Sequence, residues 1–241
     1  MDLGIAGKVA LVTAGSRGLG RASAAALAAE GARVMVSGRD EASLEETRRV
    51  LADLGADIAV CAGDVTDPGE PVQLVAATVE RFDGLDILVA NAGGPPPGRA
   101  VDLSDEALEA ALNANLMTSI RLAREALPHM RSAGWGRICC ITSYTVKQAA
   151  PMLALSNTAR VGLWGWVKTA AHDLAAESSG ITVNMVCPGP HATDRMKELG
   201  GSGPMGDPDD FGSVVAFVCS QQARFVNGAA IVVDGGSTLA L

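Results

Sequence analysis

Aromatic residues are scarce in this chain. They occupy 3% of its 241 positions, with a single tyrosine, so a hydrophobic share of 48% has to come mainly from Ala, Val, Leu and Ile. Such a composition suits helices packed closely against a sheet. No run approaches the roughly 20 apolar residues that a membrane span needs. The N-terminus lacks the apolar core of a signal peptide. We therefore expect a cytoplasmic protein with one large core and no membrane segment.

Excess positive charge and paired cysteines are also missing. The formal net charge of −8 disfavours nucleic acid and acidic membranes as partners. Five cysteines form no C-x-x-C pair, which favours small buried hydrophobes in a reducing compartment over disulfides or metal ligands. Cys139 and Cys140 are neighbours on an expected strand and should point to opposite faces of a sheet. We expect no metal site.

Apolar runs rich in β-forming residues alternate with segments of helical periodicity. The expected strands span 8–13, 33–37, 57–61, 85–90, 136–142, 181–187 and 229–233. The expected helices span 18–30, 41–54, 68–81, 104–132, 152–178 and 208–220. This alternation predicts right-handed crossovers and a doubly wound parallel α/β sheet of Rossmann type, with about seven strands and helices on both faces. No linker or repeat divides the chain, so residues 1–241 are predicted to form one dinucleotide-binding domain.

A glycine-rich turn joins the first expected strand to the first helix. Its backbone N–H groups and the helix N-terminus suit a phosphate. The glycines do not match the general G-x-G-x-x-G pattern, and many such turns serve only close packing of helix on strand. The candidate phosphate-binding residues are Thr13, Gly15, Ser16, Arg17, Gly18, Leu19 and Gly20.

The end of the second strand bears on the choice between NAD and NADP. An NAD site usually places a carboxylate there to hold the ribose 2′-hydroxyl. This chain has Ser37, with Arg39 two residues on and Arg17 in the glycine turn. Two guanidinium groups suit a 2′-phosphate, although both could instead be solvated surface residues. The pattern favours NADP over NAD.

Taken in order along the chain, these segments resemble the short-chain dehydrogenase/reductase family, and within it the β-ketoacyl-carrier-protein reductase-like branch. Residues 13–20 are similar to T-G-x-x-x-G-x-G, with Ala14 in place of the first glycine. Val226–Gly228 and Val233–Gly236 resemble the family's closing segment. Further cofactor-binding residues implied by the resemblance are Asp64 and Val65 near the adenine, Asn91, Ala92 and Gly93 after the fourth strand, and Pro188, Gly189 and Thr193 near the nicotinamide.

The resemblance implies hydride transfer between a nicotinamide cofactor and a small carbonyl compound or secondary alcohol. It assigns catalytic roles to Asn115 and Ser143. Where the family has Y-x-x-x-K, this chain has Ser156 and Arg160, while the flanking residues keep register. The alternatives are a weakly active or inactive NADP-binding sensor or assembly protein on the same fold and, third, a lyase or hydrolase.

The two replacements have separate consequences. Spacing i,i+4 places Ser156 and Arg160 on one helix face. Arg160 can supply positive charge and hydrogen bonds, but we expect its pKa to stay above about 12, which excludes a proton relay. Ser156 is a far weaker acid than a phenol and is shorter. A water held by Ser156 and Ser143 could fill the gap, with slower proton transfer expected.

Three other residues are candidate proton donors or neighbours of the site. Tyr144 follows Ser143 directly, and Lys147 lies three residues further on. Tyr144 is either a donor or part of a pocket wall. His191, in the loop before Thr193, could reach the substrate or be solvated.

Substrate access and assembly are the last expectations. The region 194–207 is predicted to form a short lid, because its glycine-rich middle is a poor helix former. Such a lid predicts an open site or one closed by a partner chain. The resemblance implies a homodimer or homotetramer built on the helices 104–132 and 152–178. Of Trp164 and Trp166, at least one could face outward into a partner, and the alternative is burial against the sheet.

Overall fold

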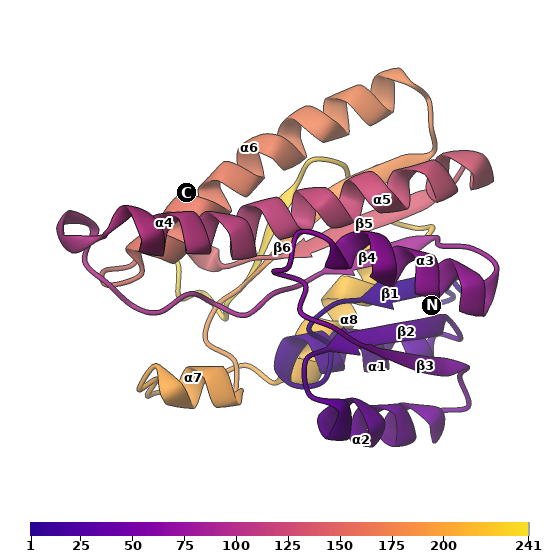
Figure 1. The fold of residues 1–241 in the computed structure, drawn as a ribbon, viewed down its shortest axis with the longest axis horizontal. Helices are drawn as coiled ribbons and strands as arrows, with labels where there is room; N and C mark the ends of the chain where they lie inside the picture. The colour runs from indigo at the N-terminus through magenta and orange to yellow at the C-terminus, as the bar shows by residue number, and fades with distance from the viewer. Residues whose placement is uncertain (241) are drawn as a thin grey trace.

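One parallel sheet organises the chain, and the computed structural model describes residues 1–240 of it (Figure 1). All neighbouring strands run parallel, in the order β3-β2-β1-β4-β5-β6-β7. The strands are β1 (Val9–Val12), β2 (Arg33–Gly38), β3 (Ile58–Ala62), β4 (Ile87–Ala90), β5 (Gly136–Ile141), β6 (Ile181–Pro188) and β7 (Ala230–Val233). The chain crosses over between β3 and β4, so the strand order reverses beside β1. Crevices at such a point bind ligands at the carboxyl ends of the strands.

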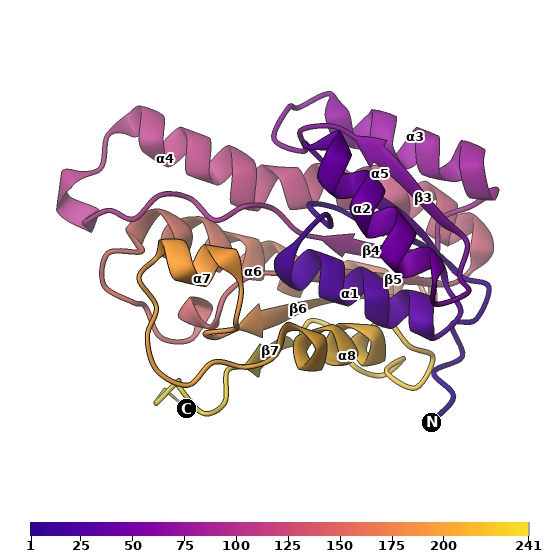
Figure 2. The ribbon, with the colours of Figure 1, turned by 90° about the horizontal axis from the view of Figure 1, so that it is seen from below.

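Helices cover both faces of the sheet, which confirms the predicted fold class (Figure 2). One face carries α1 (Gly18–Ala29), α2 (Glu41–Ala52) and α8 (Pro208–Val218). The other carries α3 (Glu70–Phe82), α5 (Thr118–Ala133) and α6 (Ala154–Ala176). The shorter helices are η1 (Ala100–Asp102), α4 (Asp105–Leu112), η3 (Tyr144–Val146) and α7 (Asp194–Glu198).

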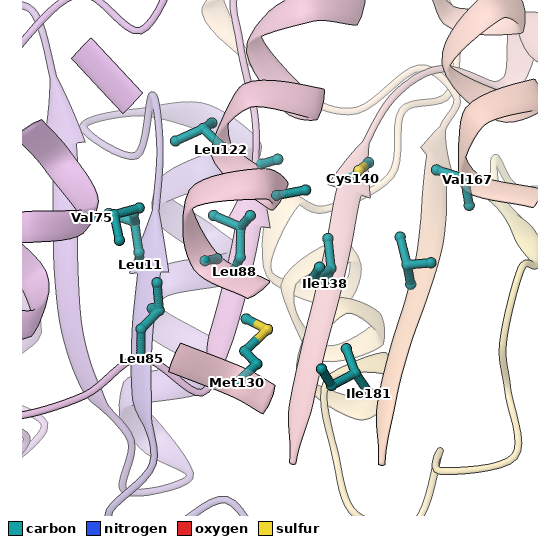
Figure 3. Packing of buried hydrophobic residues seen from close by; sticks show 14 of the residues in the cluster. Leu11, Val75, Leu85, Leu88, Leu122, Met130, Ile138, Cys140, Val167 and Ile181 are labelled. Carbon is teal, nitrogen blue, oxygen red and sulfur yellow. The ribbon is translucent and has the colours of Figure 1, made fainter. Parts of the chain in front are cut away.

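Two buried clusters fill the spaces between the sheet and its helices. Figure 3 shows the one beneath α3, α5 and α6, where Leu88 and Ile138 of the sheet meet Leu122 of α5. Cys140 belongs to this cluster and Cys139 to the opposite one, so the two thiols point to opposite faces as predicted. The five cysteines are free.

The helix predicted over 104–132 is not continuous. Ser104 caps its start through a hydrogen bond from the Ala107 N–H (3.2 Å), but a π-helical turn, η2 (Asn113–Met117), separates α4 from α5. The Asn113 amide donates to the Thr66 carbonyl (2.7 Å), and the Thr118 hydroxyl donates to the Val65 carbonyl (3.0 Å). These bonds fasten the turn to the segment after β3. π-turns of this kind are frequent at functional sites.

Both tryptophans of α6 are half-buried against the core cluster beneath α5 and α6. The Lys147 ammonium lies 4.2 Å from the centre of the Trp164 ring. Both rings thus pack partly onto the cluster, and contact of either with a partner chain stays a prediction. In residues 1–240, none of the helices combines the length and the apolar character that a membrane crossing requires.

The segment predicted to form the lid follows β6. Thr193 caps α7, its hydroxyl accepting from the Met196 N–H (3.3 Å), and the glycine-rich stretch after Glu198 is not helical, as predicted. A parallel bridge joins His191 to Gly206. The Ala192 N–H donates to the Gly206 carbonyl and the Gly206 N–H to the Pro190 carbonyl (both 2.9 Å). Both ends of the lid are therefore held together.

Candidate cofactor and catalytic site

The glycine turn is fixed to the neighbouring strand end. The Thr13 hydroxyl donates to the Asn91 carbonyl (2.7 Å) and accepts from the Asn91 N–H (2.9 Å). The Asn91 side-chain amide donates to the Ala14 carbonyl (3.2 Å). On the far side, the Gly15 N–H donates to the Ser37 carbonyl (2.8 Å), and the Thr47 hydroxyl donates to the Ser16 carbonyl (3.0 Å). The turn is thus tied to β2, α2 and β4.

Ala14 occupies the left-handed backbone region, with φ of 45°. An L-residue with a Cβ is strained there, whereas glycine is not. Leu19 and Gly20 follow in the first turn of α1, where Arg17 is the N-cap and makes no side-chain capping bond. The N–H groups of that turn are therefore open to an anion, which the helix dipole also favours.

The carboxylate nearest the end of β2 is engaged in a helix cap. Asp40 caps α2, and its hydrogen bonds from Ser43 lower the pKa of its carboxyl. At Gly38 an added Cβ would lie 3.1 Å from the Ser16 Oγ. Ser37 is fully buried and its hydroxyl has no partner among the described residues, so its side chain faces the interior. Arg39 is exposed.

The segment after β3 approaches from the adenine side of the predicted site. Asp64 accepts hydrogen bonds from the Thr66 N–H (3.0 Å) and hydroxyl (2.8 Å). These bonds, followed by the charge of Arg39 at 3.9 Å, lower the pKa of the Asp64 carboxyl. Val65 is buried in the core.

Asn115 lies in the middle of the π-turn with both polar atoms of its amide unpaired. The residue is 4% exposed, and neither its Oδ1 nor its Nδ2 has a hydrogen-bond partner among the described residues. Buried polar groups are almost always hydrogen-bonded, because an unpaired one costs about 1–3 kcal/mol. A group that persists in this state marks a place where a ligand or water can bind.

Ser143 begins η3, just beyond β5. Its Oγ accepts from the Thr145 N–H (3.2 Å), which leaves the hydroxyl proton free to be donated. The preceding Thr142 contacts the Cys187 thiol (3.2 Å) on the neighbouring strand. Burial raises the pKa of that thiol, against the opposing effect of the Thr142 hydrogen bond.

Ser156 and Arg160 meet on α6. The Arg160 Nε donates to the Ser156 Oγ (3.1 Å), and its Nη1 donates to the Ile141 carbonyl at the end of β5 (3.2 Å). Both residues are buried. Burial is the main cause that lowers the pKa of Arg160 to about 10. The expectation that this pKa stays above about 12 is wrong, because the guanidinium lies in the interior and its two hydrogen bonds go to neutral oxygens.

The nicotinamide side of the predicted site is formed by the end of β6. Gly189 packs on Asp234, whose Cβ would lie 2.4 Å from a Cβ added at the glycine, and Pro188 pairs with Val233 of β7. Thr193 packs against Gly18: a Cβ added at Gly18 would lie 3.6 Å from the Thr193 methyl. Ala92 is half-buried and Gly93 is exposed in the loop after β4. The cofactor residues predicted from sequence thus gather around the strand ends.

His191 is buried in the segment after β6. It is 4% exposed, its Nδ1 lies 3.1 Å from the Gly189 carbonyl, and its ring packs edge-on against Phe211 (5.3 Å between centroids). The alternative of a solvated imidazole is wrong, because Phe211 and Gly206 enclose the ring. Contact with a substrate stays untested. Tyr144 is half-buried and Lys147 is exposed, and a role for either in proton transfer stays untested.

A family model described as enoyl-(acyl carrier protein) reductase matches residues 13–238. The chain belongs to the short-chain dehydrogenase/reductase family. Within this family of NAD(P)-dependent oxidoreductases, it is 33% identical over 245 residues to the 3-oxoacyl-[acyl-carrier-protein] reductase FabG of Vibrio cholerae, covering 97% of this chain and 98% of that protein. It is 31% identical to the human dehydrogenase/reductase SDR family member 4, covering 97% and 88%. L-sorbose reductase from Gluconobacter frateurii, solved with NADPH and L-sorbose, has a TM-score of 0.93, 30% identity and full coverage of both chains.

Sequence reasoning overlooked one residue of this site. Arg195, in the lid helix α7, donates from its Nη2 to the Pro95 carbonyl (2.8 Å) in the loop after β4. The sequence did not indicate a contact for the basic residues of 194–207, because a charged residue in a loop is usually solvated. A contact between residues 100 positions apart emerges only from the fold.

Proposed function

We propose that the protein is an NADP-dependent reductase of a small carbonyl compound, or the reverse dehydrogenase of its secondary alcohol. In this proposal Ser156 and Arg160 take the place of the family's tyrosine and lysine. The observation that carries the proposal is the hydrogen bond from the buried Arg160 guanidinium to the Ser156 hydroxyl. It lies where the strand ends also gather Ser143 and the unpaired amide of Asn115. The structural likeness to a sorbose reductase solved with NADPH supports the same cofactor and a polar carbonyl substrate.

The residues present fit a nicotinamide dinucleotide. The open first turn of α1 and the residues 13–20 would hold the pyrophosphate, with Asp64 beside the adenine ribose. Arg17 and Arg39 would bind the 2′-phosphate, and Asp40, the carboxylate nearest the end of β2, is engaged in capping α2. The nicotinamide end would contact Asn91, Ala92, Gly93, Pro188, Gly189 and Thr193. When bound, NADPH supplies the hydride for the substrate carbon.

In this proposal Ser143 and Ser156 bind and protonate the substrate oxygen. Each hydroxyl accepts a hydrogen bond from the protein, from the Thr145 N–H and the Arg160 Nε respectively. Each therefore keeps its own proton to donate. Ser143 polarises the carbonyl, and Ser156 passes a proton to the oxygen as its negative charge develops, directly or through a water held between the two serines. Solvent returns that proton.

Arg160 supports this transfer electrostatically. Its positive charge, held in the interior beside the Ser156 oxygen, stabilises negative charge that develops on the serine or the substrate oxygen. Arginine remains a weak acid even at a pKa of about 10. We expect turnover below that of a tyrosine-containing relative by roughly 10²–10⁴-fold, the usual contribution of general acid catalysis.

A non-catalytic NADP-binding sensor or assembly protein is the alternative. The replacement of the tyrosine by Ser156 favours it, because an aliphatic hydroxyl is a poor general acid. Assembly into a homodimer or homotetramer through α4, α5 and α6 also stays a prediction, which sedimentation of the purified protein would test.

The test measures NADPH and NADH binding by thermal shift, followed by nicotinamide absorbance with a panel of ketones, ketoses and 3-oxo esters. The double variant Ser156→Tyr with Arg160→Lys should raise turnover.

The cofactor site is tested separately. Arg17→Gln with Arg39→Gln should weaken NADPH binding and leave NADH binding little changed. The pair Arg48→Gln and Arg49→Gln is the matched control, because both arginines pair with Glu45 on the exposed surface of α2. Binding without turnover in either form favours the sensor; no NADPH binding contradicts both functions.

A further inference from the structure

The segment that follows β7 makes a tight turn at the carboxyl end of the sheet. The Asp234 carboxylate holds this turn, because it accepts hydrogen bonds from the Gly236 N–H (2.9 Å) and the Thr238 N–H (2.7 Å). Gly235 and Gly236 have left-handed backbones, with φ of 60° and 81°, which glycine adopts without strain. We call residues 234–240 the C-terminal flap; they lie at the same end of the sheet as α7 (Figure 2).

One side chain holds the far end of the C-terminal flap. The Gln148 Oε1 accepts hydrogen bonds from the backbone N–H groups of Leu239 (2.8 Å) and Ala240 (3.1 Å). Apolar burial contributes little to this contact, because Leu239 is 86% exposed. The two hydrogen bonds to a single oxygen therefore act as a latch. An exposed segment held by two such bonds belongs to the least stable parts of a fold and opens readily.

The latch residue belongs to a fixed part of the site. Gln148 lies just beyond η3, whose turn begins where the Val146 N–H donates to the Ser143 carbonyl (3.2 Å). Val146 is buried in the core, and the Lys147 ammonium lies over the Trp164 ring. The turn η3 is thus anchored from within the protein. The flap, whose side chains are mostly exposed, is the part of this contact that can move.

The base of the flap lies beside the nicotinamide end of the predicted cofactor site. The Gly189 N–H donates to the Val233 carbonyl (2.9 Å), and a Cβ added at Gly189 would lie 2.4 Å from the Asp234 Cβ. The flap therefore runs from the neighbourhood of Gly189 to the loop that follows Ser143. A carbonyl substrate lies between these same two residues, since it has to be within reach of both the nicotinamide and the Ser143 hydroxyl.

We propose that the C-terminal flap borders the substrate, that Gln148 latches it closed, and that the closed flap selects short carbonyl substrates over long ones. The inference rests on the proposed reductase function. Because the flap joins two walls of the site, a substrate that extends past β7 meets the flap and has to displace it. The two hydrogen bonds of the latch are lost in that displacement, so a long substrate binds more weakly by their combined strength.

Two 3-oxo esters that differ only in chain length test the proposal, namely ethyl 3-oxobutanoate and ethyl 3-oxododecanoate with NADPH. The wild-type protein should reduce the short ester with the higher kcat/KM. Gln148→Met keeps the length of the side chain and loses the acceptor. It should raise the long-to-short ratio of kcat/KM by roughly 10-fold, through a lower KM for the long ester, and leave NADPH affinity unchanged. Gln148→Glu keeps acceptor oxygens and should retain the wild-type ratio.

The donors on the flap provide a matched test of the same contact. Leu239→Pro with Ala240→Pro removes both N–H groups and should change the ratio as Gln148→Met does. Leu239→Ala keeps its N–H and is the control. Combining the proline pair with Gln148→Met should add nothing, because both changes remove the same hydrogen bonds. In Gln148→Met, the flap amides should also exchange hydrogen roughly 10-fold faster, while the exchange of η3 stays unchanged.

The outcomes separate this proposal from the reductase function on which it rests. A wild-type protein that prefers the long ester overturns the selective flap and leaves the reductase intact. So does a ratio that stays at its wild-type value in Gln148→Met and in the proline pair, even where the flap amides exchange faster. A variant that is merely less stable gives this second result, because it lowers both rates together.

If no carbonyl compound is turned over by any form of the protein, the reductase function fails. In that case, thermal shift of the protein with NADPH and the two esters decides the role of the flap. A stabilisation by the long ester that appears only in Gln148→Met supports the flap as a barrier to long ligands, and its absence overturns the proposal.

Discussion

The Nε of Arg160 lies 3.1 Å from the Oγ of Ser156, one helical turn away, and the guanidinium that makes this bond has no carboxylate partner within residues 1–240. A buried cation paired only with neutral oxygens is costly to the fold. Its pKa, lowered mainly by burial to about 10, expresses that cost. Because the folded-state pKa lies below the ordinary value of an arginine, the destabilisation is fully present below about pH 10 and is relieved as the pH rises above about 10 toward that ordinary value.

Arg160→Met should therefore stabilise the protein while strongly lowering its activity. Methionine fills the interior without a charge, and we expect a gain of roughly 1–4 kcal/mol in the free energy of unfolding at neutral pH. Carbonyl reduction should fall by about two orders of magnitude or more, because Ser156 loses its donor. Urea denaturation and nicotinamide absorbance measure the two effects. A variant that is less stable than wild type would show that the hydrogen bonds to Ser156 and Ile141 outweigh the buried charge.

Reductase activity should decline as the pH rises through about 10. The protonated guanidinium holds Ser156, and its loss removes both the hydrogen bond and the positive charge. Initial rates at saturating NADPH, with circular dichroism to verify folding at each pH, give the profile. The Arg160→Lys variant should show the decline at lower pH, since burial also lowers the pKa of a lysine and its ordinary value is about 10.4. Identical profiles would mean that this residue does not set the alkaline limit.

Replacing Ala14 by glycine should stabilise the glycine turn. The alanine has φ of 45°, which costs an L-residue about 1–2 kcal/mol. We expect a net gain of about 1 kcal/mol, or roughly 2–4 °C in Tm for a chain of this size, and tighter NADPH binding. Ala25→Gly, in the interior of α1, is the matched control and should lose about 0.5–1 kcal/mol. Equal losses in both variants would show that the turn carries no strain.

A carboxylate at the end of β2 should change the cofactor preference. Gly38→Asp places negative charge where a 2′-phosphate is expected, and NADPH affinity should fall by about tenfold or more while NADH binding improves. Since a Cβ at this position would lie 3.1 Å from the Ser16 Oγ, the variant is best combined with Ser16→Ala. Ala42→Asp, on the exposed side of α2, controls for charge alone. Unchanged selectivity would place the 2′ end of the cofactor elsewhere.

Gly206→Ala should disturb the lid without affecting the glycine turn. The added methyl would lie 2.9–3.0 Å from the His191 ring, which Phe211 prevents from moving back. We expect a higher KM for the carbonyl substrate and little change in NADPH affinity. Ser202→Ala, in the exposed part of the lid, is the control. An unaltered KM would indicate that the lid does not contribute to substrate binding.

Sequence periodicity was sufficient to predict the seven strands and the two helical layers, because each strand or helix is marked by the pattern of apolar residues within its own segment. The break at Asn113–Met117 was not predictable in this way. It depends on hydrogen bonds to Val65 and Thr66, about 50 residues earlier in the chain. The positions of Asn115 and of the Ser156–Arg160 pair follow from local spacing and family resemblance.

Properties that depend on enclosure could not be predicted. The pKa of Arg160 falls because β5 and α6 bury it, and His191 is buried because Phe211 and Gly206, more than ten residues away, close around its ring. The Arg195–Pro95 contact likewise joins two loops whose sequences are unremarkable by themselves. Local pattern gave the positions of these residues but not their surroundings.

The bridge between His191 and Gly206 has one further consequence. Since both ends of the segment 192–205 are anchored at neighbouring points, we expect that the residues after Thr193 can be lengthened, shortened or exchanged while the sheet and the predicted cofactor residues stay in place. The lid is in this sense a replaceable cassette. Grafting the corresponding segment of a relative between these two anchors would transfer substrate choice separately from the cofactor scaffold.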